Sequence, residues 1–298
     1  MRHIIHPDKQ KFVIVLVAAL VSLFGFEMAS QAIEAYQVAQ FLEISIYVYL
    51  FLVFLQIFIF DLHLKRAGSW QKLEKSLWHA LKARFEYLKE GHHWLHFQNY
   101  LILPGFIYWT TIVLIYLNPF DTFLKQVWII MSTIALAKTF WYLKVVFYLH
   151  SEAGRIRRQL LFLTKLYASY LAFTAALGIM RYFGYGGELT GLLTFLITFL
   201  LMYQALFQHH FVGFETLKLL FYTSLALGVA GYLVYFFWNV NYYSGGLVLT
   251  ALYNTIWGII HHKYIDKNLT VETVYEYLAV LFVILVIVFS TTNFAEKI

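Results

Sequence analysis

The stretch FVIVLVAALVSLFGFEMASQA, residues Phe12–Ala32, decides the fold class, because Glu27 is its only charged residue. A helix of roughly 20 apolar residues crosses the hydrocarbon core of a bilayer. Basic residues precede it, at Lys9 and Lys11, as they precede the apolar core of a signal peptide. The apolar run is longer than such a core. We therefore interpret Phe12–Ala32 as an uncleaved first membrane span.

The composition extends this interpretation to the whole chain of 298 residues, which is 61% hydrophobic and 13% charged. Soluble domains are about half apolar and about a quarter charged. The net charge of +6 therefore indicates a membrane surface and not a nucleic acid as the partner. The absence of cysteine excludes disulfides, thiolate metal sites, Fe–S clusters and cysteine nucleophiles.

Apolar segments of spanning length recur along the chain and predict an all-α, polytopic helix bundle. Because no periodic repeat or low-complexity linker separates them, we expect a single integral membrane domain over residues 1–298. The nine predicted spans are Phe12–Ala32, Val38–Phe60, Asn99–Leu117, Val127–Leu149, Gln159–Met180, Leu189–Gln208, Leu219–Phe237, Gly245–Ile260 and Val274–Ser290.

Most of the 22 Lys and Arg residues lie in alternate connections between these spans. Basic residues mark the cytoplasmic side of membrane proteins. We therefore expect a multi-pass protein of the cell membrane, with a cytoplasmic N-terminus and an external C-terminus. The longest connection, Asp61–Gln98, has Trp70, Leu77 and Phe85 at helical spacing among charged residues. This pattern predicts an amphipathic helix on the cytoplasmic face.

All twelve histidines fall on the predicted cytoplasmic side, although Lys and Arg alone defined that side. Three clusters stand out: EGHHWLH at Glu90–His96, QHHF at Gln208–Phe211 and IHHKYID at Ile260–Asp266. Residues three or four apart share a helix face, so the first and third clusters each place donors on one side, whereas the adjacent His209 and His210 point roughly 100° apart. Glu90 and His93 also form a Glu-x-x-His pair, a spacing that di-iron bundles use.

Imidazole nitrogen with some carboxylate oxygen is a donor set that suits iron, with zinc, copper or manganese as alternatives. The sequence therefore predicts a metal site if the clusters converge. Without convergence, the histidines are polar residues at helix ends, where they interact favourably with the last carbonyls. The candidate ligands are His92, His93, His96, His209, His210, His261 and His262, with Asp266 and Glu90 as ligands or as groups that orient the imidazoles.

The elements His92-His93-Trp-Leu-His96, His209-His210 and His261-His262 resemble the histidine clusters of membrane di-iron oxygenases. These are the fatty-acid desaturases and hydroxylases, the alkane hydroxylases and the bacterial Brp/Blh-type β-carotene dioxygenases. The resemblance implies iron bound at the ends of membrane helices and an apolar substrate. The first element reads His-His-x-x-His, whereas a desaturase box reads His-x-x-His-His.

The leading functional hypothesis is a metal-dependent membrane oxidoreductase, similar to an oxygenase, hydroxylase or desaturase, that acts on a lipid or isoprenoid. Its metal would lie at the cytoplasmic membrane face, where an electron donor and O₂ reach it while an apolar tail enters between helices. A catalytic residue other than the metal ligands is not indicated.

Three other functions remain open. Lys138 lies in the middle of the fourth span, where a charge needs a partner or a wet cavity. With Glu27, Glu43 and Asn254 it would line the path of a transporter or channel. Paired histidines also bind haem, although haem ligands usually lie within facing spans. A non-catalytic subunit of a membrane complex would leave the histidine clusters apart.

Overall fold

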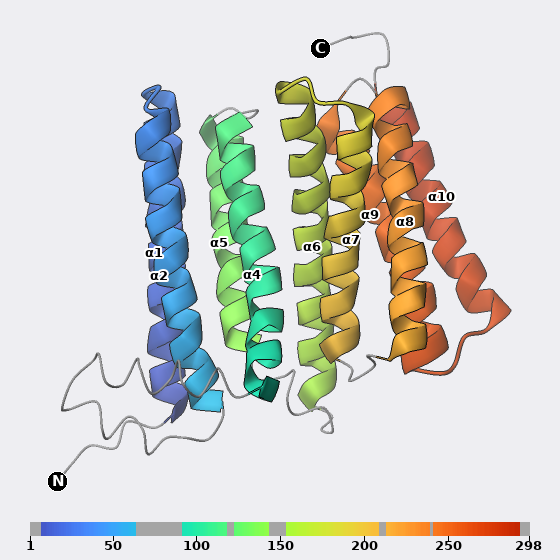
Figure 1. Ribbon diagram of the computed structural model, residues 1–298, viewed down its shortest axis with the longest axis horizontal. Coiled ribbons are helices and arrows are strands. Elements are labelled where there is room, and N and C mark those ends of the chain that lie inside the picture. Colours follow the sequence, from blue (N-terminus) through green and yellow to red (C-terminus); the bar gives the residue numbers. More distant parts are fainter. Residues whose placement is uncertain are drawn as a thin grey trace. The chain divides into compact units, whose positions relative to one another are not determined.

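The computed structural model describes residues 7–63, 91–117, 122–142, 153–208, 213–238 and 241–292. Over these residues the chain is helical and contains no strand (Figure 1). It divides into two compact units, Met1–Thr164 and Lys165–Ile298. The helices are α1 (Pro7–Glu34), α2 (Val38–His63), α4 (Gly91–Leu117), α5 (Thr122–Tyr142), α6 (Ala153–Tyr182), α7 (Gly187–Gln208), α8 (Phe214–Phe237), α9 (Tyr242–Ile260), the short π-helix η3 (His261–Ile265) and α10 (Val271–Thr291).

In unit 1, α1 packs against α2, α4 and α5. Tyr108 of α4 lies at the centre of this packing and is fully buried. Its ring stacks on Phe26 with 5.3 Å between centroids, and its hydroxyl donates a hydrogen bond of 2.7 Å to the Ser45 carbonyl oxygen. Aromatic stacking with a satisfied hydroxyl stabilises the helix packing without leaving a buried polar group unpaired.

In unit 2, α7 and α8 pack closely through two glycines. A Cβ atom on Gly191 would lie 3.0 Å from the Gly228 carbonyl oxygen, and a Cβ on Gly228 would lie 3.0 Å from the Gly191 carbonyl oxygen. Small residues let membrane helices pack through their backbones in this way. The next helix, α9, packs against α8 and α10, and its Gly246 lies against Thr174 of α6.

Eight of the described helices are long and apolar enough to cross a membrane. They correspond to eight of the nine predicted spans. The segment predicted as the remaining span, Gly245–Ile260, does form α9, but α9 is not among the eight. Neighbouring helices bury 11 of its 19 residues, including Tyr253 and Thr255. A helix that contacts protein on most sides has less need of the uniformly apolar surface that lipid requires.

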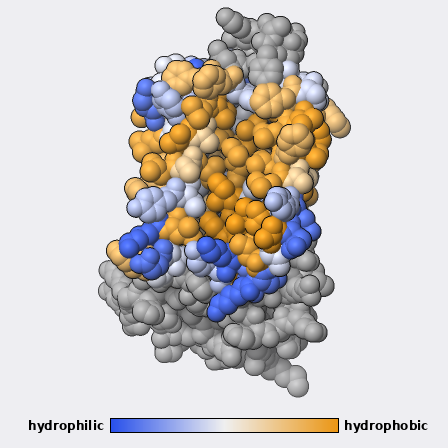
Figure 2. All heavy atoms as spheres, turned by 90° about the vertical axis from the view of Figure 1, so that its right-hand side faces the viewer, coloured by the Kyte–Doolittle hydropathy of each residue, from blue (hydrophilic) through white to orange (hydrophobic). Residues whose placement is uncertain are grey.

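The exposed surface of unit 2 matches a bilayer environment. Figure 2 shows a broad hydrophobic band with hydrophilic residues gathered above and below it. Large apolar side chains such as Phe282, Val283 and Phe289 of α10 are more than half exposed, and Val288 is the only buried residue of that helix. The predicted amphipathic helix in Asp61–Gln98 falls largely on residues 64–90, which lie outside the described residues.

Candidate functional site

The last histidine doublet begins a π-turn at the end of α9. The backbone N–H of Asp266 donates to the His261 carbonyl oxygen at 3.1 Å, a hydrogen bond that spans five residues. The backbone N–H of Asn268 donates to the His262 carbonyl oxygen at 3.1 Å. Single π-turns are rare and occur frequently at functional sites. This turn brings residues five apart onto one face, which an α-helix does not do.

The consequence is that one carboxylate reaches both imidazoles. Asp266 Oδ2 lies 3.1 Å from His261 Nδ1 and 3.5 Å from His262 Nδ1. His262 Nδ1 also lies 2.9 Å from Asn268 Oδ1. Oxygen acceptors at Nδ1 favour the tautomer that carries its proton there. The nitrogen with the lone pair is then Nε2 in both rings.

Three aromatic contacts fix the planes of these rings. Trp257 meets His261 edge-on at 5.9 Å between centroids, and the two imidazoles are themselves 5.9 Å apart at 82°. Tyr277 of α10 lies beside His262, also at 5.9 Å. Tyr277 comes this close because a Cβ at Gly258 would overlap its ring. The imidazoles are therefore held on two sides, by Asp266 and by the aromatic rings.

Burial lowers the pKa of His261 below its ordinary value of about 6.5. The charges of His262 and of Lys165 on α6 act in the same direction, whereas the Asp266 carboxylate raises this pKa. The lowering effects outweigh the raising one. His261 is therefore neutral at pH 7, which is the form that binds a metal or accepts a proton.

The structure describes the third histidine cluster more fully than the other two. His92, His93 and His96 lie in the first two turns of α4, in unit 1, but their side chains are not among those described. Glu90, His209 and His210 lie outside the described residues. Among the side chains that are described, no three from His, Asp and Glu form a group that could hold a metal ion. His261 and His262 would thus need further ligands.

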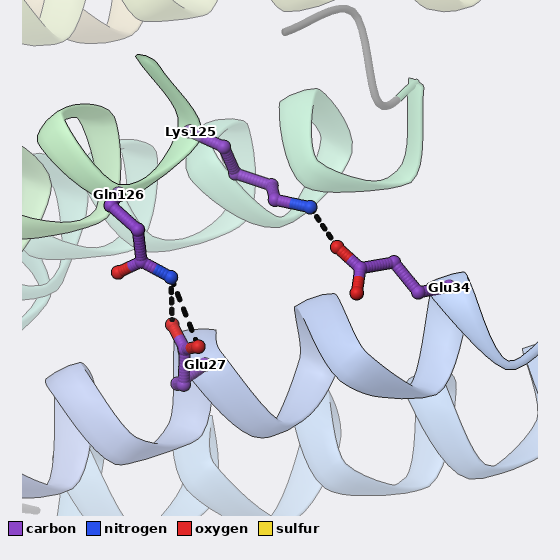
Figure 3. A network of polar contacts seen from close by, with 4 residues as sticks. All are labelled: Glu27, Glu34, Lys125 and Gln126. Atoms are coloured by element: carbon purple, nitrogen blue, oxygen red, sulfur yellow. Dashed lines mark hydrogen bonds and ion pairs between the residues drawn. The ribbon is translucent and has the colours of Figure 1, made fainter. Parts of the chain in front are cut away.

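Glu27, one of the two acids proposed as partners of Lys138, is bonded to a different residue (Figure 3). Gln126 of α5 donates hydrogen bonds of 3.0 and 2.9 Å to both carboxylate oxygens of Glu27. Two turns further along α1, a third acid, Glu34, pairs with Lys125. Glu43 is exposed on α2. Each of these acids is therefore either bonded to a residue other than Lys138 or open to the surroundings.

Two polar residues within the helices have no such partner. Lys138 of α5 and Asn254 of α9 are both half-buried. Within the described part of the chain, neither side chain makes a hydrogen bond or an ion pair.

Sequence reasoning missed two members of the site on η3, Asn268 and Tyr277, and one contact between residues that it did name. His261 contacts Asp266 at a spacing of five, which the helical rule of three and four does not predict. Asn268 and Tyr277 carried no pattern of their own. A usable signal was Gly258, because a glycine inside a helix often marks a close approach of another group.

No protein-family model, curated protein or solved structure matches this chain significantly.

Proposed function

We propose that the protein is a metal-dependent membrane oxidoreductase, similar to an oxygenase, hydroxylase or desaturase, that acts on a lipid or isoprenoid. Its site would include the His261 end of unit 2, which the charge pattern predicts to face the cytoplasm. The observation that carries the proposal is the carboxylate of Asp266 against the Nδ1 atoms of His261 and His262. Histidine metal ligands almost always donate their second ring N–H to a carboxylate, carbonyl or water.

The donors beyond His261 and His262 are expected from the second doublet. The chain runs in opposite directions through α7 and α8 and through α9 and α10. The end of α7 and the start of α8 therefore lie at the same end of unit 2 as η3 (Figure 1). His209 and His210 are in the connection between α7 and α8. Iron fits imidazole ligands with nearby carboxylate, and it is the metal that the resemblance to di-iron oxygenases implies.

Each described residue has a defined part in this proposal. His261 and His262 would bind the metal through Nε2, and the metal would supply the redox chemistry that the side chains lack. Asp266 orients both rings and keeps the proton on Nδ1. Burial keeps His261 neutral, so that a proton does not compete with the metal near pH 7. An electron donor would approach from the aqueous side of the same face.

Metal analysis of the purified protein tests the proposal directly. The wild type in mild detergent should retain about one metal ion or more per chain, and a His261→Ala/His262→Ala double variant should lose most of it. His63→Ala, which removes an isolated histidine at the end of α2, is the matched control and should retain the metal. A wild type with less than one metal per chain and full stability in chelator would contradict the proposal.

A second candidate function, transport, is favoured by Lys138 alone. A half-buried lysine without an ion pair in the described part of α5 resembles the intramembrane cations that mark substrate or ion pathways. Flux into proteoliposomes that disappears in Lys138→Met, with metal content unchanged, would favour transport over the oxidoreductase. Flux that is absent from the wild type would remove this candidate.

A further inference from the structure

Asn254, Gly258 and His262 form one stripe along α9, because residues four apart lie above one another on a helix. Tyr277 of α10 covers the middle of this stripe. A Cβ at Gly258 would overlap the edge of its ring and lie 2.8 Å from its hydroxyl oxygen. The phenol therefore lies on the α9 backbone at Gly258, and its ring centroid is 5.9 Å from that of His262.

The two polar groups on this stripe above His262 are both unsatisfied. Asn254 and Tyr277 are half-buried. Neither the Asn254 amide nor the Tyr277 hydroxyl makes a hydrogen bond to any residue that the structure describes. Polar groups buried in apolar surroundings cost free energy unless they are hydrogen-bonded. Two polar side chains without a hydrogen-bond partner among the described residues, one of them packed against Gly258 and His262, indicate a place where a ligand supplies the missing hydrogen bonds.

The bilayer directly borders the seam between α9 and α10 that carries Asn254 and Tyr277. The helix α10 packs mainly against α9, and Val288 is its only buried residue. The seam between the two helices is therefore flanked by lipid-facing side chains such as Leu278, which is 45% exposed. A molecule dissolved in the membrane would reach the seam sideways, without passing through water.

We infer that Asn254 and Tyr277 bind the polar group of a neutral lipid that carries a hydroxyl or carbonyl group. An amide and a phenol both donate and accept hydrogen bonds, which matches an alcohol, aldehyde or ketone. The stripe carries no lysine or arginine, and the nearby Asp266 carboxylate disfavours an anionic head group. The apolar tail lies along α10 in the bilayer, and the carbon atoms next to the polar group lie nearest His262.

This inference names the substrate class of the proposed oxidoreductase and depends on that function only for the subsequent chemistry. Binding can be tested on chelator-treated protein, so metal loss does not affect the result. The probes are tritiated octadecanol, octadecane and stearate, added to the full chain in nanodiscs. Octadecanol should bind saturably and more tightly than the other two.

Three single variants separate the contacts. Asn254→Leu and Tyr277→Phe should each weaken octadecanol binding about five- to tenfold, the effect of one neutral hydrogen bond, and leave octadecane binding unchanged. Tyr275→Phe removes a phenol from the same helix, but Tyr275 is 67% exposed, so binding should not change. Asn254→Leu should also raise the midpoint of thermal unfolding without ligand, because it removes a polar group that has no partner.

Three results would overturn the inference. Equal binding of octadecanol and octadecane would show that the polar group is not recognised. Tighter binding of stearate would assign the head-group site to a cation such as Lys165. A lower unfolding midpoint in Asn254→Leu with unchanged octadecanol affinity would give Asn254 a purely structural role. Selective octadecanol binding by a protein that never holds metal would keep this inference and exclude the metal-dependent chemistry.

Discussion

The polar contacts between α1 and α5 in unit 1 differ in kind from the cluster on η3 in unit 2. In unit 1 each acid has its own donor: Glu27 accepts from Gln126, and Glu34 pairs with Lys125. In unit 2 a single carboxylate, Asp266, lies against two imidazoles. In the first arrangement each donor is matched by one acceptor. In the second, two imidazoles share one carboxylate, and the other nitrogen of each ring is left for a ligand.

This difference separates a structural role from a functional one. The Glu34–Lys125 pair joins a buried ammonium to a half-exposed carboxylate, with side-chain exposures of 9% and 51%, so its main effect is on helix packing. The η3 cluster holds two imidazoles in fixed orientations through Nδ1. Such an arrangement gives little stability by itself, but it prepares the other ring nitrogen for a ligand. The predictions below test this assignment at both sites.

Asp266→Asn should have the largest effect, and it should act on metal binding. The amide keeps the size of the side chain but removes the charge that orients both imidazoles. Loss of a carboxylate that orients histidine ligands typically reduces metal affinity 10- to 100-fold, or about 1.4–2.7 kcal/mol. Competitive titration with a chelator of known affinity would measure the change.

The control for this variant is Glu272→Gln, which removes a nearby acid from the first turn of α10. Its metal affinity should equal that of the wild type. If both variants weaken binding equally, the effect comes from the loss of net negative charge, and the specific contact between Asp266 and the imidazoles has no special part in it.

Glu34→Gln should have the next largest effect, and it should act on stability alone. The variant leaves the Lys125 ammonium buried without its counter-ion, which is costly, but the half-exposed position of Glu34 allows partial solvation. We expect a loss of about 1–2 kcal/mol in the free energy of unfolding, measured in detergent. Glu43→Gln, at an exposed position on α2, should change stability by less than about 0.5 kcal/mol. A change in metal content in Glu34→Gln would contradict the structural assignment.

Much of the fold follows from the sequence because lipid imposes a strong, local requirement on composition. In the described part of the chain, eight helices meet that requirement, from Lys11–Glu34 to Val271–Thr291. The helix α9 is the instructive case, because its Tyr, Asn, Thr and Gly residues pack largely against other helices. Hydropathy measures how well a segment suits lipid, so it describes a helix that is buried by its neighbours less well.

The site was less predictable because it depends on a local departure from α-helical geometry. The spacing of four between His262 and Asp266 correctly suggested a shared face. The contact of His261 with Asp266 requires the π-turn, and the contact of Tyr277 requires α10 to lie on Gly258. No short-range pattern in the sequence predicts either of these two contacts. Whether EGHHWLH and His209–His210 contribute ligands stays a prediction.

The smallest expected effect is the pH dependence of stability, and it tests the charge balance at η3. In the folded, chelator-treated protein burial holds the pKa of His261 below the value of about 6.5 that it has when unfolded. As the pH falls through 6.5 the unfolded state binds the proton first, so stability should decrease towards acid. In His261→Gln this part of the decrease should disappear. In Asp266→Asn it should become larger, because the carboxylate raises the pKa of His261 and its removal lowers that pKa further. Thermal unfolding between pH 5 and pH 8 measures this loss of stability in all three proteins.

The contrary result is a loss of stability at acid pH that is the same in all three proteins. It would mean that His261 does not titrate as its surroundings require, and the contrast with the Glu27 and Glu34 contacts of unit 1 would lose its electrostatic basis.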